Sequence, residues 1–213
     1  MLHATVNSGL CFSFLCVSHY KQGVGYLQRL GICHRDLSLE NLMVHGDNCL
    51  VIDLGMCLRL PFQEAEDEDA EATSQFTTRR RRFMKPQGAC GKWNYMAPEV
   101  LSNVVLFDGF QIDLWAVGVT LFMMVTGFPP WAKPVDTDDR FYYITRGYLT
   151  NVLAGWELGL SADVVHLLQM MLYVDPRLRP NLEQIWKHPW LDADEHERAN
   201  APLGTLRAAV TRT

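Results

Sequence analysis

The stretch His34-Arg-Asp-Leu-Ser-Leu-Glu-Asn41 contains side chains whose types and spacing suit the transfer of a phosphoryl group. Asn41 and the later Asp53 are hard oxygen ligands, which suit Mg²⁺ bound jointly with substrate phosphates. Asp36, on the loop beside such a metal, is placed to orient a hydroxyl nucleophile and to accept its proton. Each residue alone is more commonly a turn residue, a helix cap or a solvated side chain, so the hypothesis depends on the three together.

A short β-hairpin is expected to bring the two metal ligands together. Apolar runs over residues 42–44 and 49–52 flank the polar stretch 45–48, which is typical of two strands around a turn. Antiparallel pairing about that turn is expected to place Asn41 opposite Asp53. Two ligands from different parts of the sequence would thus converge.

Helices are predicted on both sides of this hairpin. One has apolar residues every three to four positions from Tyr20 and ends at Gly31. Residues 112–125 are apolar nearly all round and carry one charge, Asp113, which predicts a buried central helix too short to span a membrane. Two later helices are expected to begin at the capping residues Ser161 and Asn181.

The composition favours a single globular unit with reduced cysteines. Its 19 basic and 24 acidic residues give a formal charge of -5, which argues against a nucleic-acid or anionic-membrane surface. The six cysteines form no CxxC pair, so we expect free thiols and a cytoplasmic location, although the arginine run 79–82 leaves a nuclear one open. The apolar run 10–17 is too short to span a bilayer, so no membrane partner is expected.

These motifs, taken in order, resemble a eukaryotic protein kinase of the Ser/Thr type. His34-Arg35-Asp36 with Asn41 is similar to the catalytic loop, Asp53-Leu54-Gly55 to the metal-binding DFG element, and Ala97-Pro98-Glu99 to the end of the activation segment. Further matches, the last one typical of calmodulin-dependent-kinase relatives, are Asp113-Leu114-Trp115, Gly127-Phe128-Pro129-Pro130, Arg179 and His188-Pro189-Trp190-Leu191.

The resemblance implies a mainly α fold with one small β-hairpin, namely the C-terminal lobe of a kinase. The sequence contains no GxGxxG strand-loop and no Val-Ala-Ile-Lys, so the β-rich N-terminal lobe is expected to be absent. The domain is predicted over residues 20–191, with a long activation loop at 53–99 and a C-terminal tail at 192–213. Residues 1–19 stay unassigned, and a mis-started segment is one interpretation of them.

The resemblance also implies a role for each matching residue. Asp36 becomes the catalytic base, Asn41 and Asp53 bind Mg²⁺, and Met43 lies beneath the adenine ring of ATP. Glu99 and Arg179 form a buried ion pair, and Asp113 accepts backbone N–H groups of the catalytic loop. Arg35 receives a phosphate that an upstream kinase adds to the loop between residues 63 and 87, at Thr73, Ser74, Thr77 or Thr78.

The chain departs from the family pattern at two positions. Ser38 stands where Ser/Thr kinases usually carry a lysine that contacts the transferred phosphate, and Lys92 stands where they usually carry a threonine. Our hypothesis is that the Lys92 ammonium reaches Asp36 and Ser38 and supplies the missing cation. A solvated lysine is the alternative explanation.

The predicted activity is transfer of the ATP γ-phosphoryl group to protein Ser/Thr hydroxyls. Trp93 lies too far before Ala97 for the tyrosine-kinase pattern, and Glu40 is a candidate contact for basic substrate residues. Two alternatives stay open at this point: a noncatalytic, pseudokinase-like interaction module and a different Mg²⁺-dependent phosphotransferase or hydrolase.

Overall fold

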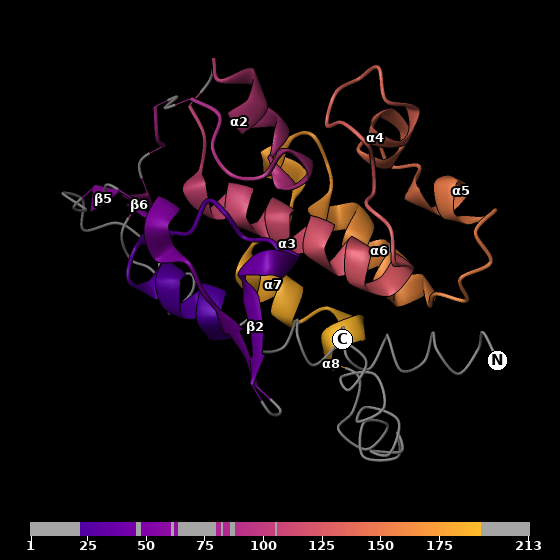
Figure 1. The fold of residues 1–213 in the computed structure, drawn as a ribbon, viewed down its shortest axis with the longest axis horizontal. Helices are drawn as coiled ribbons and strands as arrows, with labels where there is room; N and C mark the ends of the chain where they lie inside the picture. The colour runs from indigo at the N-terminus through magenta and orange to yellow at the C-terminus, as the bar shows by residue number, and fades with distance from the viewer. Residues whose placement is uncertain are drawn as a thin grey trace, which may run out of the picture.

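The fold is built around one long central helix, as the computed structural model shows (Figure 1). The structure describes residues 22–45, 48–60, 62–63, 80–81, 83–85, 88–104 and 106–192. The central helix α3 spans Gly109–Thr126, where the sequence predicted 112–125. Its longer N-terminus follows from the Asp108 cap, whose side chain accepts a hydrogen bond from the N–H of Phe110. Gly127 ends the helix in the left-handed conformation, with φ of 78°.

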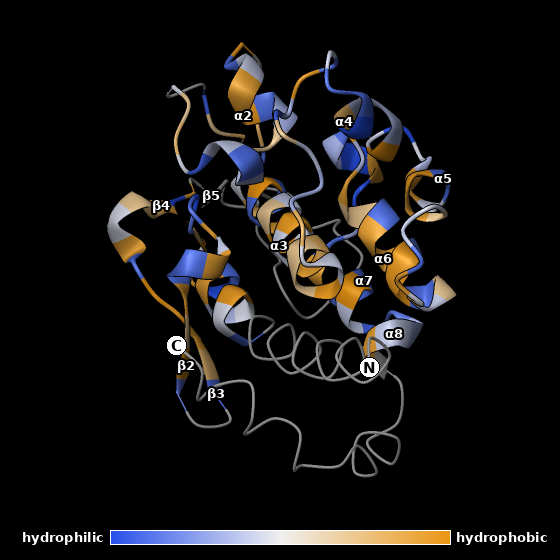
Figure 2. Cartoon of the chain, turned by 45° about the vertical axis from the view of Figure 1, so that its right-hand side comes forward, coloured by the Kyte–Doolittle hydropathy of each residue, from blue (hydrophilic) through white to orange (hydrophobic). Residues whose placement is uncertain are grey.

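Helix α3 forms the core of the domain. It packs against α6 (Ala162–Met171) and against the 3-10 helix η3 (Trp93–Tyr95). Hydrophobic residues run along α3 and the helices around it (Figure 2). The prediction that this helix is too short to cross a bilayer was wrong, because its 18 residues suffice by length and composition. Burial identifies it as a core helix, since 83% of it lies inside the fold.

Side-chain caps fix the start of both later helices, as the sequence predicted. The Ser161 hydroxyl accepts from the N–H of Val164 at the start of α6. Asn181 and Gln184 form a reciprocal capping box at the start of α7 (Leu182–Trp186). Helix α8 (Pro189–Asp192) follows at once and was not predicted. Three further short helices were also not predicted: α2 (Pro98–Ser102), α4 (Asp139–Ile144) and α5 (Leu149–Leu153).

The predicted hairpin is present, and its register corrects one expectation. Strand β2 (Leu42–His45) pairs with β3 (Asn48–Val51), and Leu42 faces Val51. The pairs Met43–Leu50, Val44–Cys49 and His45–Asn48 continue the same register along the two strands. Asn41 therefore lies opposite Ile52, whose N–H donates to the Asn41 carbonyl at 3.0 Å, and not opposite Asp53, which lies one residue further along.

Two shorter strand pairs join segments that are distant in the sequence. Strand β1 (Ile32–Cys33) pairs with β4 (Leu58–Arg59), just after the helix over residues 22–29 has ended at Gly31. Strand β5 (Phe62–Gln63) pairs with β6 (Arg80–Arg81), so the segment 63–87, predicted as a loop, contains residues that form a strand pair. The predictions for residues 1–19, for the tail 193–213 and for the four phosphorylation positions fall outside the described residues.

The cysteines that the structure describes are free thiols. Cys33 and Cys49 are buried, and Cys57 and Cys90 are partly exposed. Cys11 and Cys16 lie outside the described residues.

Candidate active site

The loop that carries Asp36 is held in place from beneath by Asp113 of helix α3. The Asp113 carboxylate accepts the N–H of His34 at 2.7 Å and the N–H of Arg35 at 2.8 Å. Burial raises the pKa of Asp113 to about 7, while these two N–H groups act in the opposite direction. Arg35 has a left-handed backbone with φ of 70°, so the loop turns sharply just before Asp36. The predicted partner of Asp113 is therefore confirmed by the geometry.

Asp36 and Asn41 are joined directly. The Asn41 amide nitrogen donates to the Asp36 carbonyl at 2.7 Å and to the Asp36 carboxylate at 3.0 Å. Asn41 is almost fully buried, so this geometry is fixed. The other Asp36 oxygen, Oδ1, is buried and has no hydrogen-bond partner among the residues that the structure describes. Most buried carboxylate oxygens have a donor, so this unpartnered oxygen is an unusual feature of the loop.

Asp53 lies beyond the open end of the hairpin, at the same end as Asn41. Its backbone is left-handed, with φ of 63°, and its Oδ1 accepts the N–H of Gly55 at 3.2 Å. Because the Asn41 amide nitrogen is engaged by Asp36, the amide oxygen is the Asn41 atom that can bind a cation. Within the described ranges, no group of three or more His, Cys, Asp or Glu side chains is placed to hold a metal. An amide oxygen and a carboxylate are hard oxygen ligands of the kind that Mg²⁺ takes together with phosphates and water.

The outer face of the hairpin carries an exposed apolar pair. Met43 and Leu50 are direct cross-strand partners, and both stay nearly half exposed. On the opposite face, Leu42 and Val51 pack against the core. The hairpin therefore presents Met43 and Leu50 to solvent while Leu42 and Val51 hold it to the core.

Lys92 lies within reach of three residues of the same loop. Its ammonium donates to the Ser38 hydroxyl at 2.7 Å and lies 3.6 Å from the Glu40 carboxylate and 3.9 Å from the Asp36 carboxylate. The sequence hypothesis required the ammonium to be within a water bridge of Asp36, and the observed distance meets that requirement. Its catalytic role stays a prediction.

Arg35, predicted to receive a loop phosphate, has a different partner here. Its guanidinium donates to the Cys90 sulfur at 2.7 Å. The phosphorylation candidates lie outside the described residues, so that role stays a prediction. The contact with Cys90 was not predicted from the sequence, because no local pattern links residues so far apart in the chain.

Comparison with known proteins decides the family. A model of the protein kinase domain matches residues 15–191. This chain belongs to the protein kinase family. Similar proteins include serine/threonine-protein kinase DCLK3 of Homo sapiens, with 31% identity over 76% of this chain. Testis-specific serine/threonine-protein kinase 3 of Homo sapiens is 30% identical over 80%, and abscisic acid-inducible protein kinase of Triticum aestivum is 28% identical over 88%.

The chain spans only part of these relatives. It covers 22% of DCLK3, 54% of the testis-specific kinase and 55% of the wheat kinase. The two human relatives, and a further relative from Oryza sativa, are serine/threonine-protein kinases by name. Their sequences are 30–31% identical to this chain.

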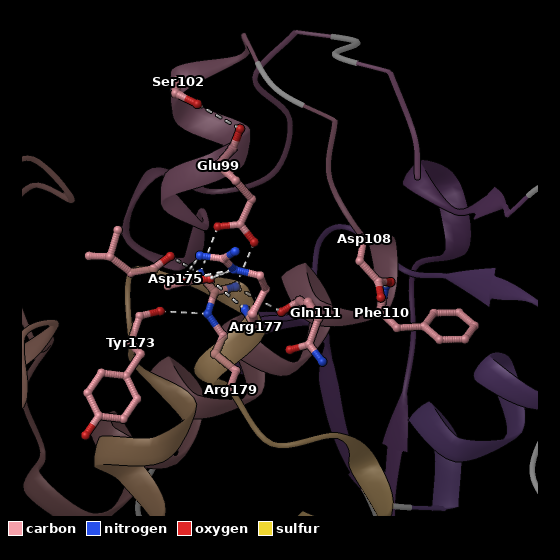
Figure 3. Close-up of polar contacts among 10 residues, drawn as sticks. Glu99, Ser102, Asp108, Phe110, Gln111, Tyr173, Asp175, Arg177 and Arg179 are labelled. Atoms are coloured by element: carbon pink, nitrogen blue, oxygen red, sulfur yellow. Dashed lines mark hydrogen bonds and ion pairs between the residues drawn. The ribbon is translucent and has the colours of Figure 1, made fainter. Parts of the chain in front are cut away.

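A buried ion pair joins the Ala97-Pro98-Glu99 motif to Arg179. Arg179 donates to both carboxylate oxygens of Glu99, at 2.7 and 2.8 Å, and the two side chains are 0% and 6% exposed (Figure 3). Its remaining donors reach backbone carbonyls of Tyr173, Val174 and Gln111. The guanidinium also stacks over Trp115. The predicted pair is therefore present, and its contacts are those of a structural anchor.

Proposed function

We propose that this chain is a protein serine/threonine kinase that transfers the γ-phosphoryl group of ATP to Ser or Thr hydroxyls of proteins. The observation that carries the proposal is the pair formed by Asp36 and Asn41. The side-chain amide of Asn41, the candidate metal ligand, donates a hydrogen bond to one carboxylate oxygen of Asp36, the candidate base. The other Asp36 oxygen has no donor among the described residues. Membership of the protein kinase family supports the same reaction.

In this reaction Asp36 has the role of general base. The substrate hydroxyl donates a hydrogen bond to Asp36, and its oxygen attacks the γ-phosphorus of ATP. A new phosphorus–oxygen bond forms as the bond to the β,γ-bridging oxygen breaks, so ADP leaves and the hydroxyl proton passes to Asp36. The hydrogen bond from Asn41 holds the Asp36 carboxylate in position for that transfer.

Asn41 and Asp53 are the proposed Mg²⁺ ligands. Bound there with ATP, the metal would neutralise negative charge on the phosphates. Met43, with its partner Leu50, provides the proposed apolar surface beneath the adenine ring. Glu40, whose side chain is 61% exposed beside Lys92, is the proposed contact for a basic residue of the protein substrate.

The described residues correspond, in this proposal, to the C-terminal lobe of the kinase domain, with affinity to calmodulin-dependent-kinase relatives. The order of the catalytic loop, the hairpin, η3, α2 and α3 supports the assignment. The conclusion that an N-terminal lobe is lacking stays a prediction, and so do the segment boundaries at residues 20 and 191.

The test is a phosphoryl-transfer assay of the full chain with γ-labelled ATP, Mg²⁺ and peptides that differ only in a Ser, Thr or Tyr acceptor. The proposal predicts label on Ser and Thr, and loss of at least about 100-fold in rate for Asp36→Asn, because the base is removed. Asp136→Asn, which alters an exposed carboxylate paired with Arg146, is the matched control and should leave the rate unchanged. Transfer to Tyr alone, or equal rates for both variants, would contradict the proposal.

A further inference from the structure

The Lys92 ammonium is held by a buried group, unlike an ordinary surface lysine. Ser38, which accepts its hydrogen bond, is fully buried, while the Lys92 side chain itself is 39% exposed. One N–H of the ammonium is therefore fixed inward. An ammonium has three N–H donors, so others stay available to an anion that approaches from solvent.

The loop fixes this ammonium through a short chain of hydrogen bonds. The Ser38 hydroxyl accepts from Lys92 and bonds to the Glu40 carboxylate. Partial burial alone would raise the pKa of Glu40, but its own backbone N–H, the Ser38 hydroxyl and Lys92 together lower it. Glu40 thus stays ionised and balances the ammonium. The charge is positioned beside Asp36 before any substrate arrives.

Lys92 reaches this position because its segment approaches the loop unusually closely. A Cβ on Gly91 would lie 2.8 Å from the Arg35 carbonyl oxygen and 3.3 Å from Asp36 Oδ1, so no other residue fits there without a shift. Just after Lys92, the Tyr95 hydroxyl accepts the N–H of Leu39 at 3.3 Å. These contacts dock residues 91–95 on the loop on both sides of Lys92.

We propose that Lys92 is the cation that binds the transferred phosphoryl group, and that docking of residues 91–95 on the catalytic loop delivers it. This inference rests on the proposed function, because it assumes that ATP binds beside Asp36. It adds a form of regulation to that site. The charge belongs to the activation segment and not to the loop that carries the base, so a change in the position of the segment removes the cation directly.

An ordinary exposed ion pair between Lys92 and Glu40 is the competing explanation. An exposed ion pair of this kind contributes little to the stability of the fold, and it forms without a third partner such as Ser38. It accounts for the 3.6 Å contact, but not for the shorter bond to the buried Ser38 hydroxyl. The two explanations differ in what each predicts for nucleotides, because only a phosphoryl-binding cation distinguishes ATP from ADP.

The experiment compares the affinities of the full chain for MgATP and MgADP by calorimetric or NMR titration. For Lys92→Ala we expect roughly tenfold weaker MgATP binding, the effect of losing one hydrogen bond from a charged donor, with MgADP affinity unchanged. Lys187→Ala is the matched control, since it removes a lysine whose ion pair with Glu183 lies on α7. It should change neither affinity. Thermal unfolding of each variant checks that the fold is retained.

A reciprocal exchange provides the second test. The double variant Ser38→Lys, Lys92→Thr returns the cation to the loop, and we expect it to recover the preference for MgATP that Lys92→Ala loses. If Lys92→Ala weakens both nucleotides equally or neither, the inference is wrong while the proposed function stands. If the unmodified chain binds neither nucleotide, the proposed function fails and the inference fails with it.

Discussion

Two groups of charged residues in this chain differ in how completely they are enclosed. In the Glu99–Arg179 pair, both carboxylate oxygens and all three guanidinium nitrogens have partners, and neither side chain is more than 6% exposed. In the group around Lys92, the side chain of Lys92 is 39% exposed, that of Asp36 is 16% exposed and that of Glu40 is 61% exposed. One Asp36 oxygen is buried there without a partner among the described residues.

The difference separates an anchor from a site that can react. A pair whose hydrogen bonds are all made has nothing left to offer a ligand, and its removal leaves buried charge behind. A group with an unused acceptor and accessible donors can exchange partners when a substrate arrives. The anchor ties α2 to the segment that follows α6, and this fixes the chain that carries Lys92.

The largest expected effect comes from breaking the anchor. Arg179→Ala leaves the Glu99 carboxylate buried without its partner, which should destabilise the fold by about 3–5 kcal/mol. The neighbouring Arg177 forms a similar ion pair with Asp175, but its side chain is 87% exposed. Urea unfolding should show a large loss for Arg179→Ala and an unchanged midpoint for Arg177→Ala. Equal losses would mean that burial does not distinguish the two pairs.

A smaller effect is expected where the activation segment approaches the catalytic loop. Gly91 and Gly88 both have a positive φ, of 86° and 85°, so both substitutions by Ala incur similar backbone strain. Only Gly91 is crowded, since nothing lies within 4 Å of a Cβ built at Gly88. Gly91→Ala should therefore be the less stable variant by about 1–3 kcal/mol in chemical unfolding. Gly91→Ala should also lose preference for MgATP, whereas Gly88→Ala keeps it; identical behaviour would refute the close approach.

The smallest expected effect is a change in the free energy of unfolding with pH, to which one histidine of the catalytic loop and one of the helical body contribute. Burial lowers the pKa of His34 in the catalytic loop and of His188 at the end of the helical body, where His166 adds to the effect. Unfolding restores the usual value of 6.5, so each of these two histidines lowers stability as the pH falls below that value. Asp113, whose pKa burial raises to about 7, acts in the opposite direction, so the histidine contribution is measured as the difference between variants. The maximum slope is about 1.4 kcal/mol per pH unit for each histidine.

Thermal unfolding between pH 7.5 and 5.5 measures this dependence. His188→Gln should flatten part of the slope, because the titrating ring is removed while a donor remains for the 2.9 Å contact with His166. Substitution of the exposed His45 by Gln serves as the control. A slope unchanged by His188→Gln would show that this histidine does not titrate with unfolding.

Sequence reasoning succeeded where a local pattern carries the signal. Capping residues such as Ser161 and Asn181 bond to groups three residues away, so the starts of α6 and α7 could be predicted. The hairpin was also predicted, but its register was wrong by one residue at Asn41. The short helices α2, α4, α5 and α8 were missed, since helices of four to six residues show little periodicity and depend on tertiary packing.

The candidate site shows the same division. The Asp113 contacts and the Glu99–Arg179 pair were expected from the family resemblance, and a lone charge in an apolar helix already required a partner. The contact of Cys90 with Arg35 and the stacking of His166 on His188 join residues with no shared pattern. Such contacts depend on how helices and loops pack, which a single sequence does not reveal.

The account's central claim is that the cluster around Asp36 binds MgATP, and a titration of the Asp53→Asn variant tests it most directly. Calorimetry on the unmodified chain, with and without Mg²⁺, is compared with Asp53→Asn and with Asp139→Asn, an exposed carboxylate on α4, as control. The account predicts saturable, Mg²⁺-dependent binding that falls at least about tenfold in Asp53→Asn alone, because a metal ligand is lost. Absence of binding, or equal binding in all three proteins, would contradict it and favour a noncatalytic interaction module.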